Sequence, residues 1–348
     1  MNDQSLSKKN IFVVLGVARS GTSTIARGLK ALGVDLGAAL IQGNQKWNPK
    51  GFFEDSDVVY KVNGQAFKTL NFAPYGIQTL EKNQQTSEQL AAVKEDAITL
   101  LKQRFEKTHY WGFKDPSTVK LLAFWQAIFA ELQLQEHYII ALRNPLSSAQ
   151  SYQKLTGCDL ELGLLLWLMY LFPAIEETHH KKRIVVSYES LLQAPVTQLD
   201  RIKMTLDIPN NADAMALSSY ATEFLDKKLH HYTYDLNDLK KHTAVGVVPL
   251  VCEVYELFLK IANDEISFES EEFVSSWQTI KEALNNIQPV YAYLDIILKR
   301  NYQLKKELRT INKSILWKML YPLRKIDNTL RERRRKIRAT RRLEKAYG

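Results

Sequence analysis

Ile11-Phe-Val-Val-Leu-Gly-Val-Ala-Arg-Ser-Gly-Thr-Ser-Thr24 is the stretch of this 348-residue sequence that decides the fold class. Its first five residues are an apolar, largely β-branched run, which is typical of a buried strand in a parallel sheet. A loop over 16–21 follows, and the pattern from Thr22 to Leu32 predicts a helix that ends before Gly33. This order predicts an anion site, because the N–H groups of the loop and of the helix start point at one place.

The rest of the body repeats the alternation of strands and helices. Further strands are predicted at 110–114, 137–142 and 183–187. Asp115 and Pro116 are an N-cap and N1 pair, and they predict a helix that runs through about Leu134. Strands that alternate with helices imply crossover connections. The sequence therefore predicts an α/β fold with a parallel sheet.

Ligands of such sheets bind beyond the carboxyl ends of the strands, and this rule gathers several polar residues into one site. The groups that follow the four strands, in chain order, are Arg19, Lys114, Arg143 and Tyr188. The first loop and helix start add the hydroxyls of Ser20, Thr22, Ser23 and Thr24. Any one of these residues alone is better explained as a solvated loop residue. Their shared location favours an anion site.

The net charge of +9 is the sum of two unlike parts. Residues 299–348 hold 18 Lys and Arg against 4 Asp and Glu, whereas residues 1–298 hold 29 against 34. The overall positive charge alone would suggest a nucleic-acid partner. The acidic body argues against that interpretation, because it offers no basic surface for a phosphate backbone. The two cysteines, Cys158 and Cys252, exclude a disulfide scaffold. No export signal is evident, and we expect a cytoplasmic protein.

The loop departs from a nucleotide-triphosphate loop at one position. Gly16–Ser23 has the spacing G-x-x-x-x-G-K-[ST], but Thr22 stands where the Lys is needed. A cation is instead present at Arg19. The stretch resembles the loop x-[KR]-S-G-T-[ST] of the PAPS-dependent sulfotransferases, in the Arg-using branch found among carbohydrate and tyrosylprotein enzymes. The resemblance implies a P-loop-like sulfotransferase fold whose loop, Gly21 included, holds the 5′-phosphosulfate.

A second motif resembles the 3′-phosphate site of the same family. Arg143-Asn-Pro-Leu-Ser-Ser-Ala-Gln-Ser151 has an Arg at a strand end and a Ser eight residues later. The guanidinium fork matches a phosphate. A helix opened by Pro145 would place Ser151 two turns away from Arg143. We therefore expect the helix to begin after Pro145, so that both side chains reach one phosphate.

Three more segments extend the resemblance to bacterial members over about Ile11–Ile261. They are Trp111-Gly-Phe-Lys-Asp-Pro116, Val186-Ser-Tyr-Glu-Ser-Leu191 and Lys50-Gly-Phe-Phe-Glu-Asp55. The resemblance implies that Lys114 assists sulfuryl transfer, that Tyr188 lies near the adenine and that Glu54 is the acceptor base. Asp115 is a rival base, and an exposed helix-start carboxylate is the structural alternative for Glu54.

The chain departs from the family in two places. Thr24 stands where cytosolic members have an adenine-stacking Trp, and the C-terminal R-K-G-x-x-G-D-W-K segment is missing. The candidates to replace that segment are Lys227, Lys228 and His230, for which a solvated charge cluster is the simpler explanation.

The C-terminal part has its own pattern, and we expect a sulfotransferase domain over 1–288 and a helical, basic tail over 289–348. Its apolar positions follow heptad spacing, with an Asn at one a position: Leu294, Ile297, Asn301, Leu304, Leu308, Ile311 and Ile315. A homodimer through 290–315 and a single amphipathic helix are equal alternatives. The basic segment 317–345 suits a peripheral contact at the inner membrane face, or a solvated end.

These patterns predict a sulfotransferase that moves the sulfuryl group of PAPS to a hydroxyl and releases adenosine 3′,5′-bisphosphate. A match between 314–324 and a segment of bacterial polysaccharide enzymes favours a glycan, surface polysaccharide or glycolipid as the acceptor. Glu54, Lys114 and Arg19 are the expected catalytic residues, and no metal is expected. One alternative is a P-loop nucleotide kinase or NTPase, which is poorly supported because Thr22 stands where such an enzyme needs a Lys. The other alternative is a non-catalytic scaffold.

Overall fold

The computed structural model describes a defined part of the chain. The described residues are 8–44, 48, 50–209, 213–225, 234–243 and 250–314. The chain divides into two compact units, Met1–Gln288 and Pro289–Gly348. The first unit contains the sheet, and the second contains the C-terminal part of a long helix.

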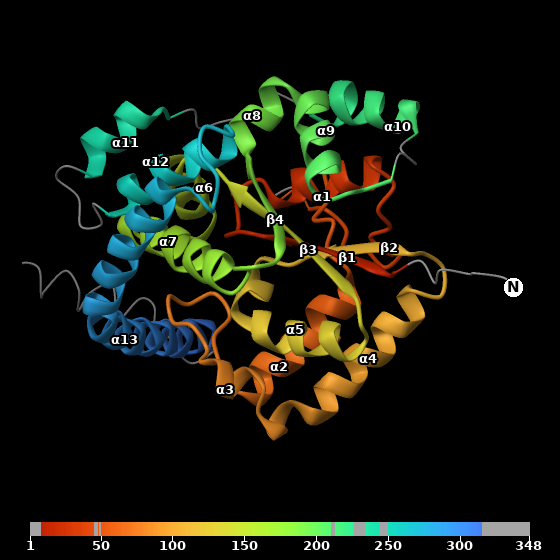
Figure 1. Cartoon of the computed structure of the whole chain (residues 1–348). Coiled ribbons are helices and arrows are strands. Elements are labelled where there is room, and N and C mark those ends of the chain that lie inside the picture. Colours follow the sequence, from red (N-terminus) through yellow and green to blue (C-terminus); the bar gives the residue numbers. More distant parts are fainter. Residues whose placement is uncertain are drawn as a thin grey trace, which may run out of the picture. The chain divides into compact units, whose positions relative to one another are not determined.

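A four-stranded parallel sheet lies at the centre of the first unit (Figure 1). Its strands are β1 (Asn10–Leu15), β2 (Tyr110–Lys114), β3 (Gln135–Leu142) and β4 (Lys182–Ser187). They are arranged in the order β2-β1-β3-β4, and every neighbouring pair is parallel. The predicted α/β class, the parallel sheet and all four predicted strands are confirmed.

Helices cover both faces of the sheet. Above it in Figure 1 lie α1 (Thr22–Ala31), α8 (Tyr188–Gln193), α9 (Pro195–Thr205) and α10 (Ala214–Ser219). Below it lie α4 (Ala91–Arg104) and α5 (Leu122–Glu131). Phe12 and Val14 of β1 belong to the hydrophobic core between the sheet and the helices α1 and α9. On the other face, Phe113 of β2 packs on Trp125 of α5. Residues 11–15 are 0% exposed, as a strand covered on both faces requires.

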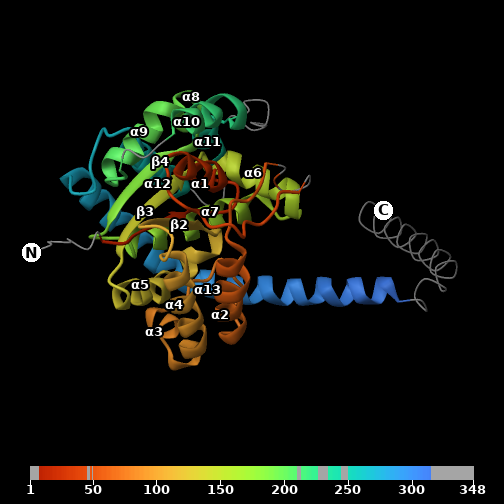
Figure 2. The same cartoon turned by 90° about the vertical axis from the view of Figure 1, so that its right-hand side faces the viewer.

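The remaining helices build the flanks of the first unit. They are α2 (Gly64–Thr69), α3 (Lys82–Gln85), α6 (Pro145–Thr156), α7 (Leu160–Glu176), α11 (Leu236–Thr243) and α12 (Leu250–Ala262). Short irregular helices are η1 (Asp57–Asn63), η2 (Glu88–Leu90), η3 (Pro116–Leu121) and η4 (Tyr220–Phe224). The last helix is α13 (Glu271–Lys313), which contains Pro289 at the boundary between the two units (Figure 2).

Two helix predictions differ from the structure. The expected start after Pro145 is wrong, because α6 begins at Pro145 and Asn144 caps it by accepting from the N–H groups of Leu146 and Ser147. The helix expected to run from Pro116 to about Leu134 is instead η3 followed by α5, which ends at Glu131. The predicted N-cap at Asp115 is confirmed by a 3.0 Å hydrogen bond from the Ser117 N–H.

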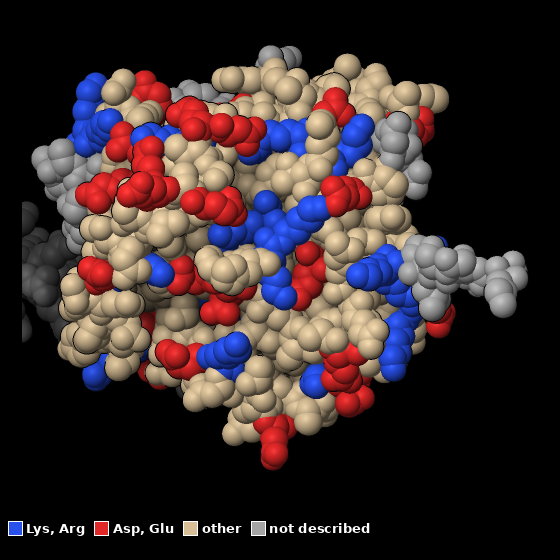
Figure 3. Space-filling model, viewed as in Figure 1, with Lys and Arg blue, Asp and Glu red and all other residues tan. Residues whose placement is uncertain are grey.

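Charge on the face of Figure 1 is mixed. Acidic and basic side chains of the described residues lie interspersed over it (Figure 3). Within the described residues, no single helix is long and apolar enough to cross a membrane. The pair α6 and α7, bent by 119°, passes that test only by length and composition.

Candidate active site

The sheet order brings the predicted site residues to one edge. The chain passes from β1 to β2 on one side and then to β3 on the other, so β1 and β3 flank a switch point, where α/β sheets bind ligands. Lys114 ends β2, Arg143 follows β3 and Tyr188 follows β4. The loop with Arg19 joins β1 to α1 at the same edge.

The loop 16–21 is built around positive φ angles. Gly21 precedes α1 with φ 92°, and Arg19, which is not a glycine, has φ 75°. A Cβ on Gly21 would lie 2.4 Å from Cδ2 of Tyr188, so only glycine fits against that ring. The buried Ser20 hydroxyl donates to the Val17 carbonyl at 2.7 Å and holds the loop closed.

Arg19 connects the two motifs that the sequence analysis singled out. Its Nε donates to Ser151 Oγ at 2.9 Å, and its carbonyl accepts from Nη1 of Arg143 at 2.9 Å. Arg143 and Ser151 therefore meet through the loop residue between them. The helix does not need a later start, because Arg19 contacts Arg143 through its main-chain carbonyl and Ser151 through its side chain.

The two guanidinium groups are largely buried, and Glu189 is the carboxyl that acts on Arg143. Burial lowers the pKa of Arg19, and the neighbouring Arg143 lowers it further. Burial also lowers the pKa of Arg143, whose side chain is almost fully enclosed. Arg143 Nε finds no hydrogen-bond partner among the described residues. An anion between these groups would restore their charge balance and supply the missing acceptor, so the residues fit a phosphate.

Tyr188 packs directly against Arg143 and Gly21. Its ring lies under the guanidinium of Arg143, with 4.7 Å between the ring centroid and Cζ. The ring also closes over Gly21, as the glycine geometry shows. Tyr188 is the first residue of α8, where Ser187 caps the helix by accepting from the Ser190 N–H. The cap therefore fixes the position from which the tyrosine reaches the loop.

Glu54 and Lys114 form an ion pair at the same edge. Lys114 Nζ donates to Glu54 Oε1, and the lysine side chain is 2% exposed while the glutamate is 14% exposed. Burial raises the pKa of Glu54, although the field of Lys114 opposes this shift. The sequence placed both residues in the site but did not predict that they pair. The alternative of an exposed helix-start carboxylate for Glu54 is wrong.

Several backbone contacts hold Glu54 at this place. Its carbonyl accepts from the Ile41 N–H at 2.8 Å, and the next residue, Asp55, forms an antiparallel bridge with Leu40. Asp55 is buried and paired with Arg104, and its Oδ1 accepts from the Asp57 N–H at 2.9 Å. The ion pair and the cap anchor the segment that carries the carboxylate.

Asp115 is held in a structural network. Its Oδ1 caps η3, and its Oδ2 accepts from Ser117 Oγ at 2.6 Å and from Asn63 Nδ2 at 2.8 Å. Asn63 also accepts from the Trp125 indole at 2.9 Å. Both carboxyl oxygens of Asp115 are therefore occupied by hydrogen bonds within the protein. The buried Asn63 was missed from the sequence, because a lone Asn in a helix carries no local signal.

The hydroxyls at the start of α1 have different surroundings. Thr22 is buried at the first position of the helix. Ser23 donates to the Phe52 carbonyl at 3.1 Å, so it ties α1 to the segment that carries Glu54. The carbonyl of Thr24 accepts from the Tyr220 hydroxyl at 3.1 Å. These three residues, with Ser20 and Gly21, stay predictions as cofactor contacts.

An exposed aromatic side chain interacts electrostatically with two carboxyls of the candidate site. Tyr75 is 59% exposed, and its hydroxyl interacts electrostatically with the carboxyls of Asp115 and Glu54. Partial burial and these carboxyls raise its pKa. The adjacent Pro74 carbonyl accepts from the Tyr170 hydroxyl at 2.6 Å, which fixes the loop.

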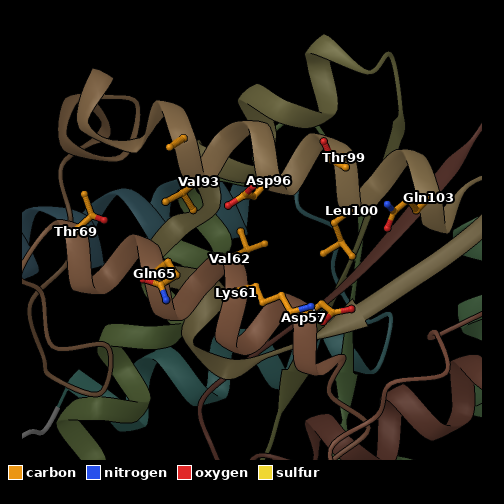
Figure 4. A pocket seen from close by; sticks show the side chains of 11 residues that line it. Asp57, Lys61, Val62, Gln65, Thr69, Val93, Asp96, Thr99, Leu100 and Gln103 are labelled. Carbon is orange, nitrogen blue, oxygen red and sulfur yellow. Dashed lines mark ion pairs between the residues drawn. The ribbon is translucent and has the colours of Figure 1, made fainter.

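A groove of about 520 Å³ lies apart from these residues, between η1, α2 and α4 (Figure 4). An apolar floor that includes Val62 and Val93 underlies a rim with Asp96 and the ion pair of Asp57 and Lys61. None of the predicted site residues lines it. Arg104 contacts both Asp57 and Asp55, so the groove and the Glu54 segment share one anchor.

Two further predictions concern what the site lacks. Within the described part of the chain, no group of three or more His, Cys, Asp or Glu could hold a metal ion. The proposed replacements for the missing C-terminal segment, Lys227, Lys228 and His230, lie outside the described residues.

The comparisons with known proteins find similarity in structure only. No family model matches the sequence, and no curated protein matches it. The sulfotransferase domain of the Synechococcus PCC 7002 olefin synthase is 18% identical, with a TM-score of 0.43, and the match covers 72% of this chain and 95% of that one. The sulfotransferase domain of the curacin biosynthetic pathway is 16% identical, with a TM-score of 0.36, covering 61% and 77%.

Proposed function

We propose that this chain is a PAPS-dependent sulfotransferase whose catalytic domain is 1–288. The single observation that carries the proposal is the contact of Arg19 with both Arg143 and Ser151, at 2.9 Å each. The sequence motifs assign the loop to a 5′-phosphosulfate and the Arg–Ser pair to a 3′-phosphate. The two segments that carry these motifs contact each other at the carboxyl ends of the strands, which supports the proposal.

The charged residues divide between holding the cofactor and performing the transfer. Arg143, with its unpaired Nε and its stacking on Tyr188, would hold the 3′-phosphate together with Ser151. Arg19 and the loop N–H groups would hold the 5′-phosphosulfate. PAPS supplies an activated sulfuryl group as the co-substrate.

Glu54 is the proposed base in an in-line displacement at sulfur. As the acceptor oxygen bonds to sulfur and the bond from sulfur to the 5′-phosphate oxygen breaks, Glu54 takes the hydroxyl proton. Lys114 and Arg19 stabilise the negative charge that moves onto the leaving phosphate, as cations do in phosphoryl transfer. Adenosine 3′,5′-bisphosphate leaves. The raised pKa of Glu54 makes it a stronger base than an ordinary carboxylate.

We further propose a saccharide hydroxyl, on a glycan, surface polysaccharide or glycolipid, as the acceptor. The sequence similarity of 314–324 to a segment of polysaccharide enzymes supports this class. The exposed ring of Tyr75, whose hydroxyl interacts electrostatically with Asp115 and Glu54, also supports it, because an aromatic face with a polar edge suits a ring that is apolar on one side and hydroxylated at its rim.

Calorimetry with adenosine 3′,5′-bisphosphate, ATP and GTP tests the cofactor. We expect tight binding of the bisphosphate alone. Binding of a triphosphate alone would favour the kinase or NTPase alternative, and binding of none would favour the non-catalytic scaffold. Transfer from radiolabelled PAPS to a panel of p-nitrophenyl glycosides, with aliphatic alcohols as controls, then tests the acceptor class.

A further inference from the structure

The second unit carries an exposed apolar stripe along α13. Its six residues are 44–64% exposed, and they are Val290, Tyr293, Ile297, Leu304, Leu308 and Ile311. With 3.6 residues per turn, these positions fall within about 60° of one another around the helix. The stripe therefore forms one face about 21 residues long, or roughly 32 Å at 1.5 Å per residue, with the polar Asn301 between Ile297 and Leu304.

Basic side chains occupy the flanks and the opposite side of the same helix. They are Lys299, Lys305, Lys306, Arg309 and Lys313, and Arg300 borders the stripe. The acidic residues of this segment are Asp295, which pairs with Lys299 at 2.9 Å, and Glu307. The helix is therefore amphipathic, with an apolar face and a strongly cationic remainder.

We propose that the stripe docks in the plane of an anionic lipid surface. The large apolar side chains would enter the boundary between headgroups and acyl chains, while the flanking Lys and Arg side chains extend to the lipid phosphates and carboxylates. Each basic residue near such a surface adds to the attraction. The sequence that follows, 315–348, adds 12 Lys and Arg against 3 Asp and Glu, which reinforces the same preference.

A second copy of this chain is the other occupant that the spacing allows. In a parallel coiled coil, Arg300 at a g position would face Lys305 of the second copy at an e position, and these like charges repel. The cationic helices as wholes would also repel each other. An anionic lipid surface attracts the cationic helix, whereas a second copy of the helix repels it. The charge pattern therefore favours lipid as the occupant.

Vesicle co-sedimentation of the full chain tests this proposal independently of the sulfotransferase activity. We expect binding to phosphatidylcholine vesicles with 25% phosphatidylserine, weak binding to pure phosphatidylcholine, and a loss of binding as salt is raised. The variant Leu304→Asn/Leu308→Asn should lower the partition coefficient about tenfold, because two leucines lose their burial in the interface. Tyr302→Asn, an equally exposed position on the opposite side, is the matched control.

Each other outcome contradicts the proposal. Equal binding by the double variant would place the lipid contact outside the stripe, and equal binding to neutral vesicles would remove the role of charge. Light scattering provides the remaining test. A wild-type dimer that the double variant dissociates would show that a second copy covers the stripe. Circular dichroism of both variants should match the wild type, because the substituted side chains are exposed.

Discussion

Ser151 Oγ accepts a 2.9 Å hydrogen bond from Nε of Arg19, a residue 132 positions earlier in the chain. The contact fixes a loop side chain on the helix that follows β3. The relationship makes Ser151 a positioning residue for the proposed phosphosulfate loop, in addition to its proposed contact with the 3′-phosphate.

Ser151→Ala should weaken the binding of adenosine 3′,5′-bisphosphate by roughly tenfold or more, because a hydrogen bond to a charged group contributes about 1.5–3 kcal/mol. Calorimetry measures this loss. Ser148→Ala is the control on the same helix, since the buried Ser148 hydroxyl has no partner among the described residues. Equal effects of the two substitutions would contradict the role of Ser151.

Arg143→Ala should discriminate between two nucleotides. We expect its affinity for adenosine 3′,5′-bisphosphate to fall by about 10–100-fold, while its affinity for 5′-AMP, which lacks the 3′-phosphate, changes much less. Titration calorimetry with both ligands gives the comparison. If both affinities fell equally, Arg143 would not be the 3′-phosphate ligand.

Glu54→Gln should reduce turnover by about 10²–10⁴-fold while leaving bisphosphate binding intact, because the amide cannot accept the acceptor proton. Glu54→Ala should lose turnover too, but it also leaves the buried Lys114 without its partner and should lower the thermal midpoint. The glutamine variant therefore gives the cleaner kinetic measurement. Near-normal transfer by either variant would rule out Glu54 as the base.

The acidic limb of the rate profile should reflect the same carboxylate. Since burial raises the pKa of Glu54 above its ordinary 4.5, kcat/KM should decrease as the pH falls through a value above 4.5. The base must be ionised to accept a proton, so activity is present above that pKa and is lost below it. A limb at or below 4.5 would contradict the assignment.

Gly21→Ala and Gly157→Ala form a matched pair. Both glycines have positive φ angles, 92° and 71°, but an added Cβ meets Tyr188 at position 21 and nothing within 4 Å at position 157. Gly21→Ala should therefore cost about 1–3 kcal/mol more in the free energy of unfolding and should also weaken bisphosphate binding. Chemical denaturation measures the first effect. Similar losses for both variants would mean that Tyr188 moves aside freely.

His137 should make the stability depend on pH. Burial lowers the pKa of this histidine from 6.5 to about 4, and its Nε2 contacts Asn10 Oδ1 at 2.9 Å. The unfolded chain takes up the proton first, so the stabilising contribution is present above pH 6.5 and is lost as the pH falls towards 4. The loss amounts to about 3 kcal/mol. Denaturation of His137→Phe, which keeps the stacking on Phe12, should lack this component.

The sheet could be predicted from the sequence because each strand is a dense apolar run. The position of the cations could be predicted because they directly follow those runs. It did not predict the partner of Lys114. Glu54 reaches that lysine through an irregular segment in which Gly51 and Phe53 have φ angles of 101° and 54°. Hydrophobic periodicity carries no information about such a backbone path.

The error at Pro145 has a related cause. The prediction placed one phosphate between Arg143 and Ser151 and moved the helix start to suit it. In the structure Arg19 lies between them, with its main-chain carbonyl accepting from Arg143 and its side chain donating to Ser151. A contact between residues more than 120 positions apart depends on packing of α6 beside the loop, which local sequence rules do not describe. The π-helical turn of η1, which presents Asn63 to Asp115, escaped prediction for the same reason.

The pairing of Lys114 with Glu54 implies an order of events for a two-substrate enzyme. While the lysine neutralises the carboxylate, the base is masked, and an acceptor that arrives first finds no group free to take its proton. A phosphosulfate that draws Lys114 towards itself would unmask the carboxylate. We expect ordered kinetics in which the nucleotide enters first and leaves last, so the bisphosphate should inhibit competitively against PAPS and non-competitively against the acceptor.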